Sequence, residues 1–371
     1  MKVVILTGRG PALGGKGDQL RAHQFATALA DRHDVTVACT DAGVAAQSGP
    51  WRELMVPCGR FVRVAGALGA LLRGQPLQVG WMMPRRAWRR LRCEAELADV
   101  VVAVTVRSMR APLDVPLVID HVDALSRNMR RRRRGPESPA FRLVFGFEAF
   151  MLRRWEQRVA RGAVAQLAIS AADAAALPAA PALRVVPNAV DLPRADPRAA
   201  RDVDVIFTGN MRYPPNLDAA RWLRADIVPA LLALRPATSV AVVGRDASAL
   251  APWDGVEVRS DVPDLFGWIA RARIAVVPLR LGTGAANKVL EAIAAGAVVV
   301  GTTDALEPFG LADDAAVVAD DPEAIAAAIA TLLDDLPRLG AMRAAAASQL
   351  GRFSSAAMQA TLEDVVASAA S

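Results

Sequence analysis

The feature that most constrains the fold is a pair of short apolar runs joined by a glycine-rich loop and a short helix. The runs are Ile274–Pro278 and Ala297–Val300. The helix between them opens with Asn287-Lys288 and ends at Gly296. Two buried strands connected by a helix are the repeating unit of a parallel α/β sheet, so this stretch predicts that class of fold.

This helix carries a lysine, Lys288, three residues before a glutamate, Glu291. Residues at that spacing share one helix face, but a lysine in the first turn has the wrong sign for the helix dipole, and lysine before glutamate is the weaker order for an ion pair. Both features are explained if an anion binds at the helix start. The pattern therefore predicts a phosphate site, with the glutamate placed for sugar hydroxyls. The alternative is a solvated Lys–Glu pair on a surface helix.

The chain has 371 residues, 53% hydrophobic and 22% charged, which predicts two domains or one large one. Its three cysteines show neither CxxC pairing nor metal-ligand spacing, so we expect a reducing, cytosolic location without structural zinc or disulfides. No apolar run reaches about 18 residues, so we expect no membrane span. The first residues, MKVVILTGRG, are typical of a buried strand rather than a signal peptide.

Both halves of the chain alternate apolar strands with helices, which predicts two Rossmann-like α/β domains facing each other across a ligand cleft. The proline- and charge-rich segment Asp191–Asp202 suggests a boundary, giving an N-terminal domain over 1–195 and a C-terminal domain over 196–371. The last helix, Ser354–Ala369, is expected to pack back on the N-terminal domain. The expected strands are 3–6, 35–39, 100–105, 117–120, 164–169, 184–187, 203–207, 239–243, 256–259, 274–278, 297–300 and 317–319. The other expected helices are 18–30, 142–161, 216–234, 262–270, 322–333 and 339–349.

Charge is divided unevenly between the halves. Residues 1–198 hold 30 Lys and Arg against 17 Asp and Glu, whereas residues 199–371 hold 14 against 21. The first half is therefore strongly basic and the second acidic, which indicates that the halves meet different partners.

Four motifs follow one another along the chain: a glycine-rich loop after the first strand, VPNAVD at 186–191, FTGN at 207–210 and GTGAANKVLEAIAAG at 282–296. In this order they resemble the retaining nucleotide-sugar glycosyltransferases of the GT-B fold, glycosyltransferase family 4, over nearly the whole chain. TGNMRYPPN at 208–216 resembles a subset linked to bacterial polysaccharide assembly. The resemblance implies sugar transfer from a nucleotide diphosphate donor to a lipid-linked, oligosaccharide or other glycan acceptor, without a metal or cofactor.

The resemblance also implies roles for residues around the second glycine-rich loop. The family glutamate at the position of Glu291 holds the nucleotide ribose hydroxyls, and the basic residue three before it, Lys288, lies near the diphosphate. A second family glutamate, which contacts the donor sugar, is Thr283 in this chain. Donor-sugar recognition would then fall to backbone amides of the same loop. The expected donor-binding residues are Gly15, Gly17, Gly209, Asn210, Thr283, Gly284, Ala285, Ala286, Asn287 and Glu291.

Two further residues join Lys288 as expected catalytic residues. Arg212 follows the strand at 203–207, where family members carry basic residues that neutralise the leaving diphosphate; their second cation stands where this chain has Asn216. His121, in LVIDHVDALS, ends a predicted strand, where family members place a histidine near the donor sugar or acceptor. A satisfied polar residue at a strand end is the alternative for His121, and a surface arginine is the alternative for Arg212.

The first glycine-rich loop, GRGPALGGKGDQLRAHQ, precedes the helix at 18–30. Its glycines let backbone amides approach a phosphate, and in the resembled family this loop faces the donor. The expected acceptor-side residues are Asp18, Arg21 and Asp123. A flexible surface loop capped by Asp18 is the alternative interpretation.

Two arginine clusters stand out: Arg130–Arg134, and Arg85–Arg92 beside Trp81 and Trp88. Basic patches with aromatic residues suit anionic membrane surfaces, so we expect peripheral contact with a membrane that carries the acceptor, and no nucleic acid. A solvated basic face is the alternative.

Two other functions fit the same architecture. A nucleotide-sugar 2-epimerase would need acid and base groups across the cleft, and the chain has three histidines. A catalytically decayed nucleotide-sugar-binding scaffold would explain Thr283 in place of the family glutamate.

Overall fold

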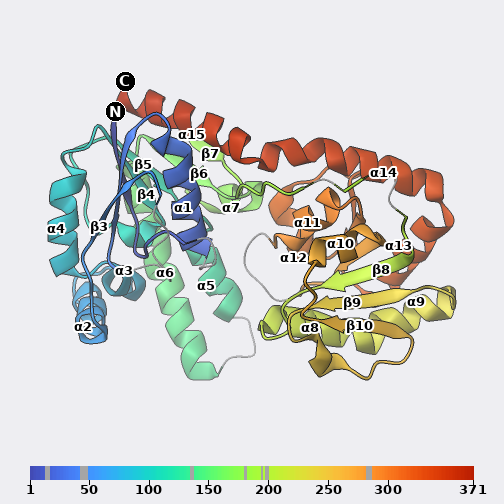
Figure 1. Cartoon of the computed structure of the whole chain (residues 1–371). Helices are drawn as coiled ribbons and strands as arrows, with labels where there is room; N and C mark the ends of the chain where they lie inside the picture. The colour runs from blue at the N-terminus through green and yellow to red at the C-terminus, as the bar shows by residue number, and fades with distance from the viewer. Residues whose placement is uncertain are drawn as a thin grey trace. The chain divides into compact units, whose positions relative to one another are not determined.

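The computed structural model describes residues 1–12, 17–41, 49–133, 138–178, 182–193, 195–196, 200–280 and 286–371, with the backbone alone at 131, 132 and 139. Its contacts divide the chain into two units (Figure 1). The first unit comprises Met1–Ala189 and Ser355–Ser371, and the second comprises Val190–Ser354. Composition suggested a boundary inside Asp191–Asp202, whereas the contacts divide the chain just before it.

The first unit is built on a seven-stranded sheet in the order β3-β2-β1-β4-β5-β6-β7, with every neighbouring pair parallel. The order reverses between β1 and β4, so the carboxyl ends of these strands border a topological switch point, where α/β sheets bind ligands. The strands are β1 Lys2–Leu6, β2 Asp34–Cys39, β3 Arg52–Met55, β4 Val100–Val104, β5 Leu117–Asp120, β6 Ala165–Ala168 and β7 Leu183–Val185.

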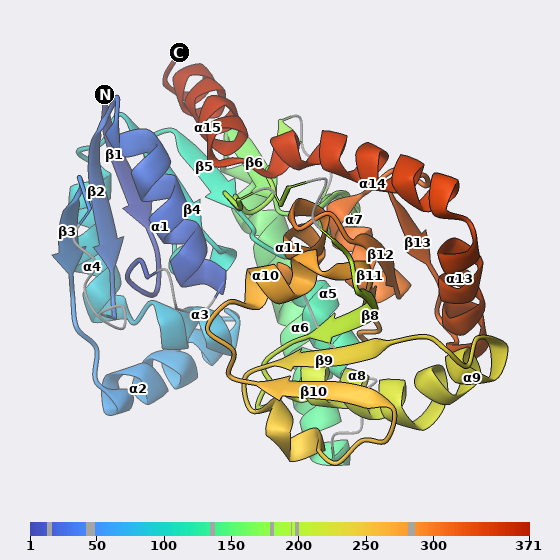
Figure 2. The same cartoon turned by 45° about the vertical axis from the view of Figure 1, so that its right-hand side comes forward.

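Helices cover both faces of this sheet. They are α1 Gly17–Ala30, α2 Arg60–Leu71, α3 Leu77–Met82, α4 Arg85–Ala95, α5 Leu125–Arg133, α6 Pro139–Arg161, α7 Ala171–Ala176 and α15 Ser355–Ala370, with a 3-10 turn η1 at Val106–Ser108. On one face, Phe25 of α1 and Leu362 of α15 belong to one buried cluster with β1 and β4. On the other face, Leu91 of α4 and Leu152 of α6 form a second cluster. Figure 2 shows α15 beside this sheet. The last helix therefore completes the core of the first unit.

The second unit contains a six-stranded parallel sheet in the order β10-β9-β8-β11-β12-β13. Its switch point lies between β8 and β11. The strands are β8 Val203–Thr208, β9 Val240–Gly244, β10 Val256–Ser260, β11 Ala272–Val277, β12 Val298–Gly301 and β13 Ala316–Val318. The helices are α8 Pro214–Trp222, α9 Val228–Leu234, α10 Leu265–Ala270, α11 Lys288–Ala294, α12 Thr303–Leu306, α13 Pro322–Asp334 and α14 Leu336–Gln349. Two parallel-sheet α/β units confirm the predicted fold class.

The helix expected over 216–234 is not continuous. A π-helical turn, η2 Leu223–Ile227, separates α8 from α9. Pro229 follows this turn, and proline has no N–H to donate to the carbonyl four residues earlier, so the wider turn relieves the broken ladder.

No helix among the described residues has both the length and the apolar composition needed to cross a bilayer.

Candidate functional site

The carboxyl edge of the second sheet is close-packed around Gly209, which follows β8. A Cβ atom at Gly209 would lie 2.9 Å from Cγ of Asn216 and 3.1 Å from Nζ of Lys288. A Cβ at Gly244, which ends β9, would lie 2.0 Å from the carbonyl oxygen of Gly209. An added Cβ at Gly209 would thus meet the side chains of Asn216 and Lys288, and one at Gly244 would meet the Gly209 backbone. The two glycines therefore let the ends of β8 and β9 approach each other and let the Lys288 amine reach the end of β8.

Lys288 is the first residue of α11, and its amine is held by protein groups. The Nζ atom donates hydrogen bonds to the Thr208 carbonyl at 2.6 Å and to Oδ1 of Asn216 at 2.8 Å. It also lies 4.7 Å from the ring centroid of Phe207. Burial lowers the pKa of Lys288 from 10.5 to about 8, a shift that Glu291 partly opposes. At pH 7 the edge of the sheet therefore carries a fixed positive charge.

Glu291 lies one turn further along α11 and is half-buried. Burial raises the pKa of its carboxyl group, and Lys288 lowers it in part. The two half-buried side chains do not form an ion pair with each other, so the alternative of a solvated Lys–Glu pair does not describe this structure. No donor to the Glu291 carboxylate is found among the described residues. A half-buried carboxylate without donors is suited to receive hydroxyl groups of a ligand.

Arg212 lies at the surface of this edge, with its side chain 78% exposed. Its guanidinium forms a two-point ion pair with Asp246, with Nε 2.8 Å from Oδ2 and Nη2 2.9 Å from Oδ1. The backbone N–H of Arg212 donates to Oδ1 of Asn210 at 3.0 Å. The cation expected to meet the leaving diphosphate is thus neutralised by a carboxylate in this structure.

Asn216 links the loop after β8 to α11. Its Nδ2 donates to the Asn210 carbonyl at 3.0 Å while its Oδ1 accepts from Lys288. The position where the resembled family carries a second cation holds no charge here, but the Lys288 amine lies beside it. Sequence reasoning missed this bridge, because the partners are 72 residues apart.

The remaining expected donor residues divide into two groups. Ala286 and Asn287 lie at the start of α11, and the Asn287 side chain is exposed. Gly17 opens α1, with nothing within 4 Å of an added Cβ. Four expected residues lie outside the described part of the chain: Gly15, Thr283, Gly284 and Ala285.

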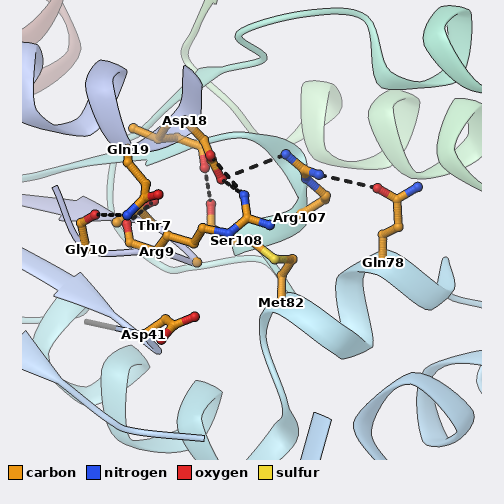
Figure 3. Close-up of polar contacts among 12 residues, drawn as sticks. Thr7, Arg9, Gly10, Asp18, Gln19, Asp41, Gln78, Met82, Arg107 and Ser108 are labelled. Atoms are coloured by element: carbon orange, nitrogen blue, oxygen red, sulfur yellow. Dashed lines mark hydrogen bonds and ion pairs between the residues drawn. The ribbon is translucent and has the colours of Figure 1, made fainter. Parts of the chain in front are cut away.

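A second polar cluster lies at the carboxyl edge of the first sheet (Figure 3). Nη1 of Arg9, after β1, donates to both oxygens of Asp18 at 2.9 and 2.8 Å. Arg107, after β4, has its Nη2 4.0 Å from Oδ2 of Asp18 and its Nη1 3.4 Å from Oε1 of Gln78. Burial lowers the pKa of Arg107, and its buried Nε has no hydrogen-bond partner in the described part of the chain. Sequence reasoning missed both arginines, although each closely follows an apolar run.

Arg21 does not have the acceptor-side role expected of it. Its side chain is fully buried and its Nε lies 3.0 Å from Oδ2 of Asp120, whose side chain is also fully buried. The remaining guanidinium hydrogens go to Oδ1 of Asp120, to the carbonyls of Val186 and Pro187, and to Oδ1 of Asn188. All five N–H donors of the Arg21 guanidinium are therefore used within the protein, and none is left for a ligand. The side chain instead links α1 to β5 and to the segment after β7.

His121 and Asp123 follow β5. His121 is 1% exposed, and its Nε2 lies 2.8 Å from Oε1 of Gln166. Its Nδ1 is buried, and no described residue offers it a hydrogen bond. Burial lowers the pKa of His121, so the ring is neutral at pH 7. Asp123 accepts a hydrogen bond from Nδ2 of Asn128 at 2.5 Å, and burial raises its pKa to about 6 against the opposing effect of Arg107. The Asp123 carboxyl group therefore titrates near neutral pH.

Residues 202–335 match the family of glycosyl transferases group 1. This range includes Lys288, Glu291, Asn210 and Arg212. No curated protein sequence matches the chain.

Solved structures of glycosyltransferases resemble the whole chain. Alr3699/HepE of Anabaena in complex with UDP is 16% identical, with a TM-score of 0.66 over 99% of this chain and 100% of that one. WaaG, a glycosyltransferase involved in lipopolysaccharide biosynthesis, is 17% identical, with a TM-score of 0.63 over 99% of each chain. Sucrose-phosphate synthase of Thermosynechococcus elongatus is 14% identical, with a TM-score of 0.66 over 98% of this chain and 97% of that one. The chain therefore has the fold of GT-B glycosyltransferases.

Proposed function

We propose that the protein is a retaining glycosyltransferase of glycosyltransferase family 4. It would move a sugar from a nucleotide diphosphate donor to a lipid-linked, oligosaccharide or other glycan acceptor, in cell-surface polysaccharide biosynthesis. The observation that carries this proposal is the half-buried Glu291 carboxylate, without a donor among the described residues, at the carboxyl edge of the second sheet. The match over 202–335, and the UDP and UDP-glucose bound by Alr3699/HepE, support a nucleotide-sugar donor.

In this proposal the chain supplies charge and position. Glu291 accepts one hydrogen bond from each of two ribose hydroxyls, which fixes the nucleotide against α11. Lys288 keeps a positive charge at the end of β8, where it compensates the charge that develops on the leaving diphosphate. The leaving diphosphate helps to deprotonate the acceptor on the same face of the sugar, so the configuration is retained, and no metal is required.

We assign the acceptor to the first unit. Asp18 and Asp123 lie at the carboxyl edge of its sheet, and Arg107 interacts electrostatically with both. The basic clusters Arg85–Arg92 and Arg130–Arg134 would bring this unit to the cytoplasmic face of an anionic membrane. Arg134 and the side chains of Arg131 and Arg132 lie outside the described residues.

Titration of UDP into the Glu291→Ala variant tests the donor site. Loss of the charge-assisted ribose contacts should weaken UDP binding by roughly tenfold to a hundredfold, because such contacts are worth about 1.5–3 kcal/mol. Glu323→Ala is the matched control, since Glu323 is exposed in the first turn of α13. Equal UDP affinity in the wild type and in Glu291→Ala would contradict the ribose role.

Turnover separates the transferase from the alternatives. Release of free nucleotide diphosphate from a panel of donors, in the presence of a lipid or oligosaccharide acceptor, is the expected result. Tight donor binding without such release would instead support a binding scaffold, and release without an acceptor accompanied by an epimerised sugar would support a 2-epimerase.

A further inference from the structure

Five arginines surround a hollow of about 350 Å³ in the first unit, and none of the residues assigned to donor or acceptor lines it. They come from three segments of the chain. Arg73 follows α2, three arginines lie on α4, and Arg110 follows η1. The three on α4 are Arg85, Arg89 and Arg92, and Trp88 of the same helix lines the hollow between them.

These positive charges are poorly compensated by the protein. Arg92 pairs with Glu96, its Nε 2.5 Å from Oε1, and has its Nη2 3.5 Å from Oδ2 of Asp114. For the other four, no carboxylate within ion-pair distance is found in the described part of the chain. Arg73, Arg85 and Arg89 are exposed, so solvent screens part of their mutual repulsion. Guanidinium groups do not lose their protons, so the positive charge of the hollow persists at every physiological pH.

Arg110 is the most buried of the five arginines. Its side chain is 6% exposed, and its described acceptor is the Met83 carbonyl, at 2.8 Å from Nη1. Burial lowers the pKa of Arg110, and the nearby charges of Arg73 and Arg85 lower it further. A buried cation that is surrounded by like charges, and that has no carboxylate, is stabilised when an anion enters the hollow.

The composition of the hollow favours a phosphate-type anion. Guanidinium groups form two parallel hydrogen bonds with phosphate oxygens, and several of them converge on one space here. A phosphate or diphosphate carries more than one negative charge, so it can neutralise several arginines at once. The volume is within the range of small-ligand pockets, which runs from about 300 Å³ upward.

We propose that this hollow is a binding site for a phosphate or diphosphate group, separate from the donor site. The helix before it points to a group carried by a lipid. Phe61 and Leu68 of α2 and Leu72, which caps its C-terminal end, are 91%, 57% and 87% exposed and follow one another at helical spacing. Leu72 immediately precedes Arg73, so an apolar surface adjoins the arginines, as an amphiphile with a phosphate headgroup requires.

Titration of inorganic diphosphate tests the site. Any binding at the second unit is common to the wild type and the variants, so a difference between them reports on the hollow alone. The double variant Arg85→Ser/Arg89→Ser should bind diphosphate at least about tenfold more weakly than the wild type. Arg86→Ser/Arg90→Ser is the matched control. Arg86 and Arg90 are exposed on the same helix, as Arg85 and Arg89 are, but they do not line the hollow. Replacing them removes the same net charge. The control should retain diphosphate affinity within about twofold, and circular dichroism should show that both variants are folded. Equal weakening in the two variants, or no diphosphate binding by the wild type, would overturn the proposal.

Sedimentation with vesicles identifies the source of the phosphate. If a lipid carries it, wild-type protein should sediment with phosphatidylglycerol vesicles and not with phosphatidylcholine vesicles. Arg85→Ser/Arg89→Ser should then weaken this binding more than Arg86→Ser/Arg90→Ser does, because only the first pair lines the hollow. Loss of diphosphate binding in Arg85→Ser/Arg89→Ser, with vesicle binding equal in both variants, would support the site but assign it to a free phosphate compound. Both readouts are independent of sugar transfer, so they stand even if the proposed activity fails.

Discussion

Replacing Lys288 with methionine tests whether burial at the end of β8 lowers the pKa of the Lys288 amine. Methionine has a similar length and apolar stem but no amine. The variant loses the hydrogen bonds to the Thr208 carbonyl and to Asn216, and the contact with the ring of Phe207. It also removes the titration of the amine, so the difference between wild type and variant depends on pH.

The magnitude follows from the pKa of about 8 in the folded protein against 10.5 for an ordinary lysine. Between these two values the unfolded chain binds the proton and the folded protein does not, so raising the pH favours folding. The full effect is roughly 3 kcal/mol, and about 2.5 kcal/mol of it falls between pH 7 and pH 10. The sign is therefore positive: the wild type should gain stability relative to Lys288→Met as the pH rises.

Urea unfolding of both proteins at pH 7, 8, 9 and 10 measures this gain as a difference in the free energy of unfolding. Other groups titrate in the same range, but they are common to both proteins and cancel in the difference. Lys288→Arg should behave like Lys288→Met, because a guanidinium does not titrate in this range. A wild-type-minus-variant difference that stays constant from pH 7 to pH 10 would refute the reasoning.

Two further predictions concern the first unit. Arg21→Met leaves the fully buried Asp120 carboxylate without its partner, so the free energy of unfolding in urea should fall by about 3–5 kcal/mol; a loss under about 1 kcal/mol would contradict the structural role. Asp123 has a folded pKa of about 6 against an ordinary 3.8, so its protonation favours folding and this contribution is lost as the pH rises through 6. Relative to Asp123→Asn, the wild type should lose roughly 2 kcal/mol of stability between pH 4 and pH 7, and equal pH profiles would disprove the assignment.

Much of the fold could be predicted because short apolar runs mark buried parallel strands. Val100–Val104 is apolar at every position and buried at every position, as expected for a central strand covered on both faces. The segment 51–95 was not assigned, although it forms β3 and three helices. Its strand, Arg52–Met55, lies at the edge of the sheet with mostly exposed residues, so it lacks the apolar signal. In α4 many positions are arginine, so the sequence shows little of the apolar periodicity that the buried residues Trp88 and Leu91 would otherwise indicate.

The candidate site was predictable in position but not in its bonding. The two apolar runs predicted a helix between two strands, and Lys288 and Glu291 lie on such a helix, α11, between β11 and β12. The partners of Lys288 are 72 and 80 residues away in sequence, and the carboxylate that captures Arg21 is 99 residues away. Such pairings are decided by how strands and helices pack, and local spacing carries no information about them. The sequence therefore predicts that a polar residue lies near a sheet edge. It does not predict whether that side chain is available to a ligand or is already hydrogen-bonded to protein groups.

The place of α15 has a consequence for synthesis of the protein. Met358 and Leu362 belong to the buried cluster of the first unit, yet 165 residues of the second unit, Val190–Ser354, are translated before them. On the ribosome, the second unit has its complete sequence first, while the face of α1 that α15 covers waits for the final helix. Premature termination before Ser355 would thus leave the earliest-made part of the protein unfinished, and its exposed apolar face would be open to chaperones or to aggregation.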